Sequence, residues 1–233
     1  MSSCESVKSV SVVIACRNGM NYLAEAVAGL QRQLVPMEII VVDDGSTDDS
    51  CKLARDLGCI VYSIPHSGLS AARNVGLRHC QGHAILFHDH DDVMRECALC
   101  RLVDALESES SPDVVMAQAQ DFISAELDEA EKSKLSLRPT PYYGLLSGAV
   151  LFRRHVFDII DNFSENLSTS QTLDILTKTE QAGFSVLRLP FVAVDRRLHN
   201  SNMGRTMQGQ EYMDSATLLR QRLATLRKGS GRA

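Results

Sequence analysis

Four apolar residues lead directly into three carboxylates and two imidazoles in the stretch Ala84-Ile85-Leu86-Phe87-His88-Asp89-His90-Asp91-Asp92. The apolar part is typical of a buried strand, so the polar part falls where that strand leaves its sheet. Unpaired charges are costly to bury, and such a cluster therefore faces solvent, a metal ion or a polyanionic ligand. Carboxylates suit a hard divalent cation that keeps some waters and binds substrate phosphates. A solvated acidic turn is the alternative, and the rest of the chain decides between the two.

Apolar runs and helical patterns alternate on the N-terminal side of this stretch. Buried strands are predicted over residues 10–15, 38–42, 59–64 and 84–87, and helices over 22–30, 51–57 and 69–77. Such alternation with short polar turns indicates a parallel sheet covered by helices, so we expect an α/β fold.

Polar side chains gather at the carboxyl ends of these strands. Arg17 follows the first strand, Asp43 and Asp44 follow the second, and the acidic cluster follows the fourth. In an open α/β sheet, ligands bind outside the carboxyl ends of the strands. The acidic cluster is therefore predicted to be part of a binding site.

The second half of the chain is less regular. We expect helices over 96–107, 155–160 and 172–181, a strand over 113–117, core packing at 148–152, and two strands, 184–189 and 191–195, divided by Pro190. Residues 121–138 are charged and weakly periodic, which predicts a mobile or helical excursion over the site. Residues 208–227 are amphipathic with a basic end, for which a solvated helix face is favoured over contact with an anionic membrane surface or a partner.

Composition limits the class of protein. The chain has 233 residues, 44% hydrophobic and 23% charged, which is ordinary for a soluble globular protein. A net charge of −5 argues against non-specific nucleic-acid binding. We expect no membrane-spanning helix and no signal peptide, since no apolar run approaches about 20 residues and residues 1–8 are polar. Seven cysteines, an odd number, favour a reducing compartment, so cytoplasmic localisation is predicted.

Six stretches together form a specific pattern. They are residues 10–14, 39–48 (with Asp43-Asp44-Gly45-Ser46), 68–76 (with Ala72-Arg73-Asn74), 82–92, 148–153 and 197–202 (with His199). Their residues, order and spacing resemble those of the family-two glycosyltransferases, and the resemblance covers most of the chain. It implies a GT-A fold, in which a Rossmann-like, mostly parallel sheet is flanked by helices and joined by a smaller acceptor-side subregion.

The resemblance also implies roles for particular residues. Asp89-His90-Asp91 resembles the DxD motif, with Asp91 the direct ligand of Mn²⁺ or Mg²⁺ and Asp89 nearer the ribose. It places the nucleotide on Ala15, Arg17, Asp43, Asp44, Arg73, Asp89 and His90, and the metal ion on Asp91, Asp89 and His199. A metal that bridges two phosphates neutralises the charge that grows on the leaving group.

Three structural alternatives stay open. Arg73 could pair with Asp43 or Asp44 for stability, and His199 could be a turn histidine. His88-x-His90-x-Asp92 also resembles the metal-binding run of some metallohydrolases, in which imidazole pairs favour zinc. That pattern normally continues with another histidine, whereas Val93 follows here.

The resemblance fails where the family has its catalytic base. The family's Glu-Asp pair at the start of a late helix aligns with Gln171-Thr172, and neither side chain can deprotonate an acceptor hydroxyl near neutral pH. Asp174 and Glu165 are the candidate replacements. Two residues of offset turn Asp174 about 200° from the site on a helix, whereas Glu165 could reach in from a loop. Ala15 and Arg17 also stand where the family often has Thr or Pro and a Tyr, although a guanidinium can stack on a base.

Two functional hypotheses follow. The first is a metal-dependent glycosyltransferase, expected to invert, that moves a sugar from a UDP- or GDP-linked donor to an unknown saccharide, lipid or protein acceptor. The second is a GT-A-like binding or regulatory module that does not transfer. We expect one domain over 1–233, with a nucleotide-sugar half at 1–108, an acceptor half at 109–205 and a basic helix at 206–233. Localisation is expected to be cytoplasmic, with the inner face of the membrane as an alternative.

Overall fold

The structure is a computed structural model of the whole chain. It describes residues 9–143, 146–202, 213–214 and 216–220. The helix predicted over 206–233 lies outside the described residues except for 213–214 and 216–220, which are helical.

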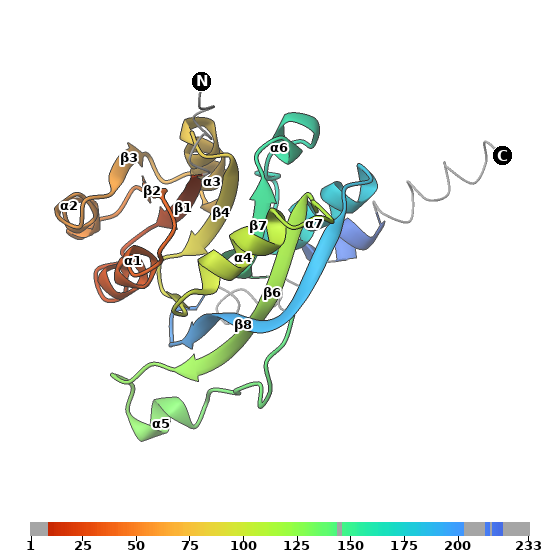
Figure 1. Cartoon of the computed structure of the whole chain (residues 1–233). Helices are drawn as coiled ribbons and strands as arrows, with labels where there is room; N and C mark the ends of the chain where they lie inside the picture. The colour runs from red at the N-terminus through yellow and green to blue at the C-terminus, as the bar shows by residue number, and fades with distance from the viewer. Residues whose placement is uncertain (1–8, 144–145, 203–212, 215, 221–233) are drawn as a thin grey trace.

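One eight-stranded sheet runs through the molecule in the order β3-β2-β1-β4-β7-β6-β8-β5 (Figure 1). Its strands are β1 (Val10–Cys16), β2 (Met37–Asp44), β3 (Ile60–Ile64), β4 (Ala84–Asp89), β5 (Val93–Met94), β6 (Val114–Ile123), β7 (Val150–Arg153) and β8 (Val186–Leu198). Strands β3, β2, β1 and β4 are parallel, and β8 is parallel to β6. β7 runs antiparallel between β4 and β6, and β5 runs antiparallel to β8. The predicted α/β fold with a mostly parallel sheet is confirmed.

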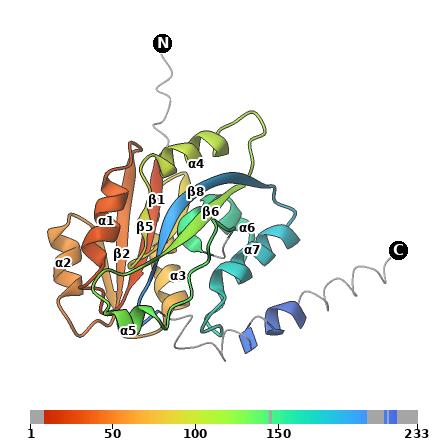
Figure 2. The same ribbon diagram turned by 90° about the horizontal axis from the view of Figure 1, so that it is seen from below.

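Helices cover both faces of the sheet (Figure 2). They are α1 (Leu23–Gln31), α2 (Ser50–Asp56), α3 (Leu69–His79), α4 (Ala98–Leu106), α5 (Glu129–Lys132), the 3-10 turn η1 (Ser147–Ala149), α6 (Val156–Ile159) and α7 (Gln171–Gln181). Alternate β1 residues point to opposite faces of the sheet. Val12 packs in the core cluster with α1, α2 and α4, and Val13 in the cluster with α3, α6 and α7.

Helix α3 lies unusually close to the centre of the sheet. A Cβ atom at Gly76 would lie 2.3 Å from a methyl carbon of Val13, so only glycine permits this approach. The close packing fixes the height of α3 above β1 and therefore the position of Arg73, one turn earlier in the helix.

Two strands were predicted where the structure has one. β8 continues through Pro190. Its pairing with β6 shifts register across that proline, between the partners of Met116 and Gln118, and again after it, between those of Gln118 and Ala119. Proline cannot donate a ladder hydrogen bond, but an irregular edge position tolerates it. β5 covers the far edge of β8 only at Val194 and Asp195. The predicted interruption at Pro190 is therefore wrong.

The charged segment 121–138 divides into two parts. Its first residues extend β6 to Ile123, which sequence periodicity did not indicate. The remainder includes α5, whose capping box joins Asp128 and Glu131. A bridge between Tyr142 and Ala119 then returns the chain to β6. The segment is therefore helical only at Glu129–Lys132, and it does not line the cavity described below, so the predicted excursion over the site is not observed.

Within the described residues, none of the helices has both the length and the apolar character needed to span a membrane. The cysteines in those residues, Cys16, Cys51, Cys59, Cys80, Cys97 and Cys100, are free thiols.

We predict that Gly76→Ala lowers the free energy of unfolding by about 1–3 kcal/mol, because the added methyl overpacks the contact with Val13. Urea denaturation monitored by circular dichroism measures the change. The double variant Val13→Ala/Gly76→Ala is the control. Its loss of unfolding free energy should be smaller than the sum of the two single losses, because the smaller side chain at position 13 makes room for the added methyl. Additive losses would show that the two residues do not share this space.

Candidate functional site

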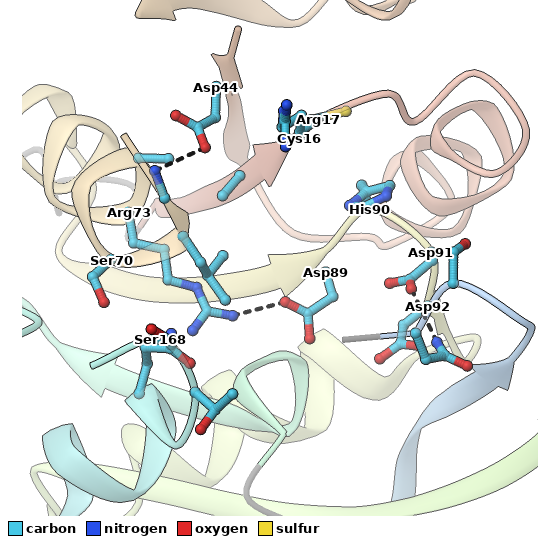
Figure 3. Close-up of a pocket in the computed structure, with 18 of the residues that line it drawn as sticks. Cys16, Arg17, Asp44, Ser70, Arg73, Asp89, His90, Asp91, Asp92 and Ser168 are labelled. Carbon is cyan, nitrogen blue, oxygen red and sulfur yellow. Dashed lines mark hydrogen bonds and ion pairs between the residues drawn. The ribbon is translucent and has the colours of Figure 1, made fainter. Parts of the chain in front are cut away.

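A cavity of about 820 Å³ lies at the carboxyl ends of β1, β2 and β4, a volume typical of a small-molecule site. Its wall is completed by the starts of α3 and α7 and by the end of β8 (Figure 3). The residues with sequence-predicted roles that line it are Ala15, Arg17, Asp44, Arg73, Asp89, His90, Asp91, Glu165, Gln171, Thr172 and His199. Asp43 and Asp174 are absent from the lining.

The two aspartates that end β2 play different structural parts. Asp44 accepts hydrogen bonds from the backbone N–H groups of Ser67 (2.6 Å) and Gly68 (3.0 Å), and its other contact is with His66 Nδ1 at 2.8 Å. Asp43 accepts from the Ser46 N–H at 3.2 Å. Asp44 therefore shapes the loop before α3 at the cavity wall, and Asp43 shapes the turn behind it.

Arg73 is 3% exposed and points along the floor of the cavity. Its Nη2 donates to Asp89 Oδ1 and to Ser147 Oγ, both at 2.7 Å. The alternative in which Arg73 pairs with Asp43 or Asp44 is wrong, because its carboxylate partner is Asp89. Helix α3, strand β4 and turn η1 thus meet at one guanidinium (Figure 3).

Asp91 and His199 face each other across the other end of the site. His199 Nε2 lies 2.9 Å from Asp91 Oδ2, and His199 Nδ1 lies 2.9 Å from Ser201 Oγ. The Tyr22 ring lies 4.6 Å from the imidazole, centroid to centroid. Burial alone would raise the pKa of Asp91, but the hydrogen bond from His199 and the nearby imidazoles hold that pKa at about 2. Asp91 is therefore an anion throughout the neutral range.

His88 and Asp92 are both buried, and Asp92 also borders the cavity. His88 is 1% exposed, and its Nε2 lies 3.2 Å from the Asp92 carbonyl oxygen. Burial lowers the pKa of His88, so its ring is neutral. Asp92 accepts from the Arg197 N–H at 3.0 Å, and burial together with the charges of Asp91 and Asp89 raises its pKa well above the usual value. Among the residues that the structure describes, no group of three His, Cys, Asp or Glu side chains is placed to hold a metal ion by itself. His88 is buried and does not line the cavity, which argues against the metallohydrolase alternative.

The donor set fits a divalent ion that takes further ligands from a diphosphate. Asp91 offers an ionised carboxylate and His199 an imidazole, while Asp89 keeps one oxygen outside its bond to Arg73. Mg²⁺ and similar ions are commonly bound by one or two carboxylates plus substrate phosphates. The small number of protein ligands is therefore compatible with such an ion.

The start of α7 presents neutral side chains to the cavity, Gln171 and Thr172 among them. Asp174 points the other way, where its Oδ2 accepts from Lys178 Nζ at 2.9 Å and from the Ser164 N–H at 3.2 Å. Glu165 does reach the cavity, and its Oε1 accepts from Asn74 Nδ2 at 3.0 Å.

Sequence reasoning missed several lining residues, namely Ser70, Leu146, Ser168, Thr169 and Arg196. Ser70 lies one turn before Arg73 on α3, a spacing that could have indicated it. The others come from irregular segments and the end of β8, whose positions depend on long-range packing.

Comparison with known proteins identifies the family. The model for glycosyl transferase family 2 matches residues 11–170. The chain belongs to this family. An uncharacterized glycosyltransferase of Rickettsia prowazekii is 27% identical over 226 residues, covering 88% of the chain and 69% of that protein. The cholesterol galactosyltransferase of Borreliella burgdorferi is 29% identical over 178 residues, covering 73% of the chain and 48% of that protein.

Solved structures share the GT-A fold at low identity. Residues 1–349 of Staphylococcus aureus TarS in complex with UDP match with a TM-score of 0.65 and 22% identity, covering 82% of the chain and 60% of that structure. The mannosyltransferase PcManGT from Pyrobaculum calidifontis, in complex with GDP-Man and Mn²⁺, matches with a TM-score of 0.66 and 16% identity. The match covers 94% of the chain and 64% of that structure.

We predict that Arg73→Lys lowers the free energy of unfolding by about 1.5–3 kcal/mol, since hydrogen bonds to charged groups contribute about that much. A lysine ammonium is more strongly hydrated and sits on a different stem, so it reproduces the contacts of Arg73 Nη2 with Asp89 and Ser147 poorly. Chemical denaturation measures the change. Arg78→Lys, on the exposed end of the same helix, is the matched control and should stay within about 0.5 kcal/mol of the parent. Equal effects of the two substitutions would contradict the central role of the buried pair.

Proposed function

We propose that this chain transfers a sugar from a UDP- or GDP-linked donor to an acceptor, with Mn²⁺ or Mg²⁺ and with inversion at the anomeric carbon. The observation that supports it most is the pairing of Arg73 with Asp89 beside that of Asp91 with His199, at the carboxyl edge of the sheet. Family membership supports sugar transfer. The UDP and GDP-Man complexes of the structural relatives favour those donors.

The nucleoside is assigned to the end of the cavity formed by β1 and β2. Asp44 borders the loop that would cover the ribose and base, and Asp43 supports the turn behind it. Arg17 lies exposed beside Ala15, where its guanidinium can stack on the base. Arg73, Asp89 and His90 line the path to the diphosphate.

Asp91, His199 and Asp89 would hold the metal ion. When bound, the ion would neutralise the charge that develops on the leaving diphosphate. Asp91 is already ionised, because His199 stabilises its carboxylate, and it needs no proton loss to bind a cation. Ser201 and Tyr22 keep the His199 ring in place from two other sides.

We assign donor binding to residues 1–108 and acceptor contacts to 109–205 within one domain. The acceptor is a saccharide, lipid or protein. We predict that the protein acts in the cytoplasm, and contact with the inner face of the membrane is the alternative. Glu165 is the one carboxylate of the two candidates that faces the cavity, so it replaces Asp174 as the candidate base.

A second candidate function, donor binding without transfer, is favoured only by the neutral side chains of Gln171 and Thr172 at the position of the family's base. A chain that binds the donor without transferring it would need no base at this position. Metal-dependent hydrolysis or transfer of donor sugar, lost in Asp91→Asn, would exclude that function.

We predict that calorimetry detects binding of UDP or GDP in the presence of Mn²⁺ and much weaker binding without it. Asp91→Asn should weaken the metal-dependent affinity at least about tenfold, because loss of one charged contact costs about 1.5–3 kcal/mol. Asp56→Asn, an exposed carboxylate on α2, is the charge-matched control and should bind like the parent. Absence of binding of either nucleoside diphosphate with Mn²⁺ would sink the proposal.

A further inference from the structure

The proposed transfer needs a group that takes the proton of the acceptor hydroxyl, because a hydroxyl does not lose its proton unaided near neutral pH. Gln171 and Thr172 line the cavity at the start of α7, and neither is a base. Asp174 points away from the cavity. Glu165 faces the cavity from an exposed loop position, and its Oε1 accepts from Asn74 Nδ2 at 3.0 Å. The start of α7 therefore leaves the task of the base open.

A carboxylate from the C-terminal part of the chain reaches the loop before α7. Asp214 is 5% exposed, and its Oδ2 accepts from the Thr169 N–H at 2.8 Å and from the Thr169 hydroxyl at 2.9 Å. Leu218, four residues later on the same face of a helical stretch, is buried as well. This stretch therefore packs on the protein and delivers Asp214 to a loop that lies 45 residues earlier in the sequence.

The Thr169 hydroxyl connects this carboxylate to the cavity. Thr169 lines the cavity wall, whereas Asp214 is absent from the lining. A hydroxyl has one hydrogen to donate and two lone pairs that accept. Because the hydrogen of Thr169 Oγ1 is donated to Asp214, its lone pairs are left for a hydroxyl bound in the cavity. The two side chains can therefore pass a proton from the cavity to a buried carboxylate.

The place of this pair in the cavity suits an inverting displacement, in which the nucleophile attacks from the side opposite the leaving group. Asp91 and His199, assigned to the cation and the leaving diphosphate, lie at one end of the site. In Figure 3, Ser168, the neighbour of Thr169, lies at the opposite end of the view from Asp91. The proton acceptor and the leaving group are thus separated as the reaction requires.

We propose that Thr169 and Asp214 form the proton relay of the transfer. This rests on the proposed function. Thr169 contacts the acceptor hydroxyl, and Asp214 is a positioning residue that acts through Thr169 and takes up its proton.

The step balances as follows for the atoms involved. The acceptor O–H bond breaks while the acceptor oxygen bonds to the anomeric carbon, and the proton passes to Thr169 Oγ1. The proton that Thr169 held passes to Asp214 Oδ2. The bond from the anomeric carbon to the donor diphosphate breaks, and its electron pair leaves on the diphosphate oxygen. Asp214 returns its proton to water before the next turnover.

The test uses water as the acceptor. The whole chain is incubated with Mn²⁺ and a panel of radiolabelled UDP- and GDP-sugars, and sugar release is measured. Asp214→Asn keeps an oxygen that can accept both hydrogen bonds from Thr169 but cannot take up a proton. We expect its kcat for hydrolysis to fall at least about 100-fold, the usual contribution of a general base, with the donor KM unchanged.

Variants of the hydroxyl test the other half of the relay. Thr169→Val should lose hydrolysis as Asp214→Asn does, and Thr169→Ser, which keeps the hydroxyl, should retain it. Thr217→Val is the matched control, since the Thr217 hydroxyl is exposed and donates to the Met213 carbonyl at 2.9 Å. It should hydrolyse the donor like the parent.

Azide ion separates proton transfer from a merely structural role. Azide is an anionic nucleophile with no proton to lose, so it needs no base. With azide present, Asp214→Asn should form the glycosyl azide at close to the parent's rate while its hydrolysis stays lost. A loop that had simply lost its shape would support neither reaction.

Several outcomes overturn the relay. They are parent-like hydrolysis by Asp214→Asn, loss of azide transfer together with hydrolysis in that variant, and a parent that binds UDP or GDP with Mn²⁺ but releases no sugar to water or azide. Loss of hydrolysis in Glu165→Gln with full activity in Asp214→Asn would assign the proton to Glu165 instead. A parent that binds no nucleoside diphosphate in calorimetry refutes the proposed function itself, which distinguishes the two failures.

Discussion

The buried guanidinium of Arg73 is the constraint on which the site depends. Taking a charge out of water is costly unless it is paired and hydrogen-bonded, and Asp89 and Ser147 both accept hydrogen bonds from its Nη2. The pair forms only if α3 lies low on the sheet, which Gly76 permits by offering Val13 no side chain. One missing methyl thus determines where a carboxylate of the acidic cluster lies. The floor of the cavity is set by packing before any ligand arrives.

The sequence predicted the elements of the fold better than their connections. Continuous apolar runs made β1, β2 and β4 visible, since strands buried on both faces lack polar alternation. Pro190 suggested a break because pairing partners cannot be read from a local pattern, yet β8 passes through it at an irregular edge. The extension of β6 through Asp121 was missed for the same reason, because charged residues there pair with a strand far along the chain.

The sequence predicted where the site lies, but not how its side chains pair. The carboxyl-end rule brought Arg17, Asp44 and Asp91 to one edge, as the cavity shows. The structural alternative for Arg73, a pair with Asp43 or Asp44, is wrong because sequence order does not reveal which carboxylate a helix faces. Within the acidic cluster, only His88 is absent from the cavity wall, and the four residues that follow it all line the cavity. Strand alternation does not predict this, because β4 ends at Asp89 and the chain then turns.

The contacts between β8 and the turn after β4 have a consequence for biosynthesis. The Arg197 N–H bonds to Asp92, and the Arg197 guanidinium to the Asp91 carbonyl, across 105 and 106 residues of sequence. Domains fold as units while the N-terminal part leaves the ribosome first. A nascent chain can pair β1 to β4 early, but Asp91 meets His199 only after nearly the whole described chain has emerged. A translation product truncated before β8 would have the strands β3, β2, β1 and β4 but would lack the contact between Asp91 and His199.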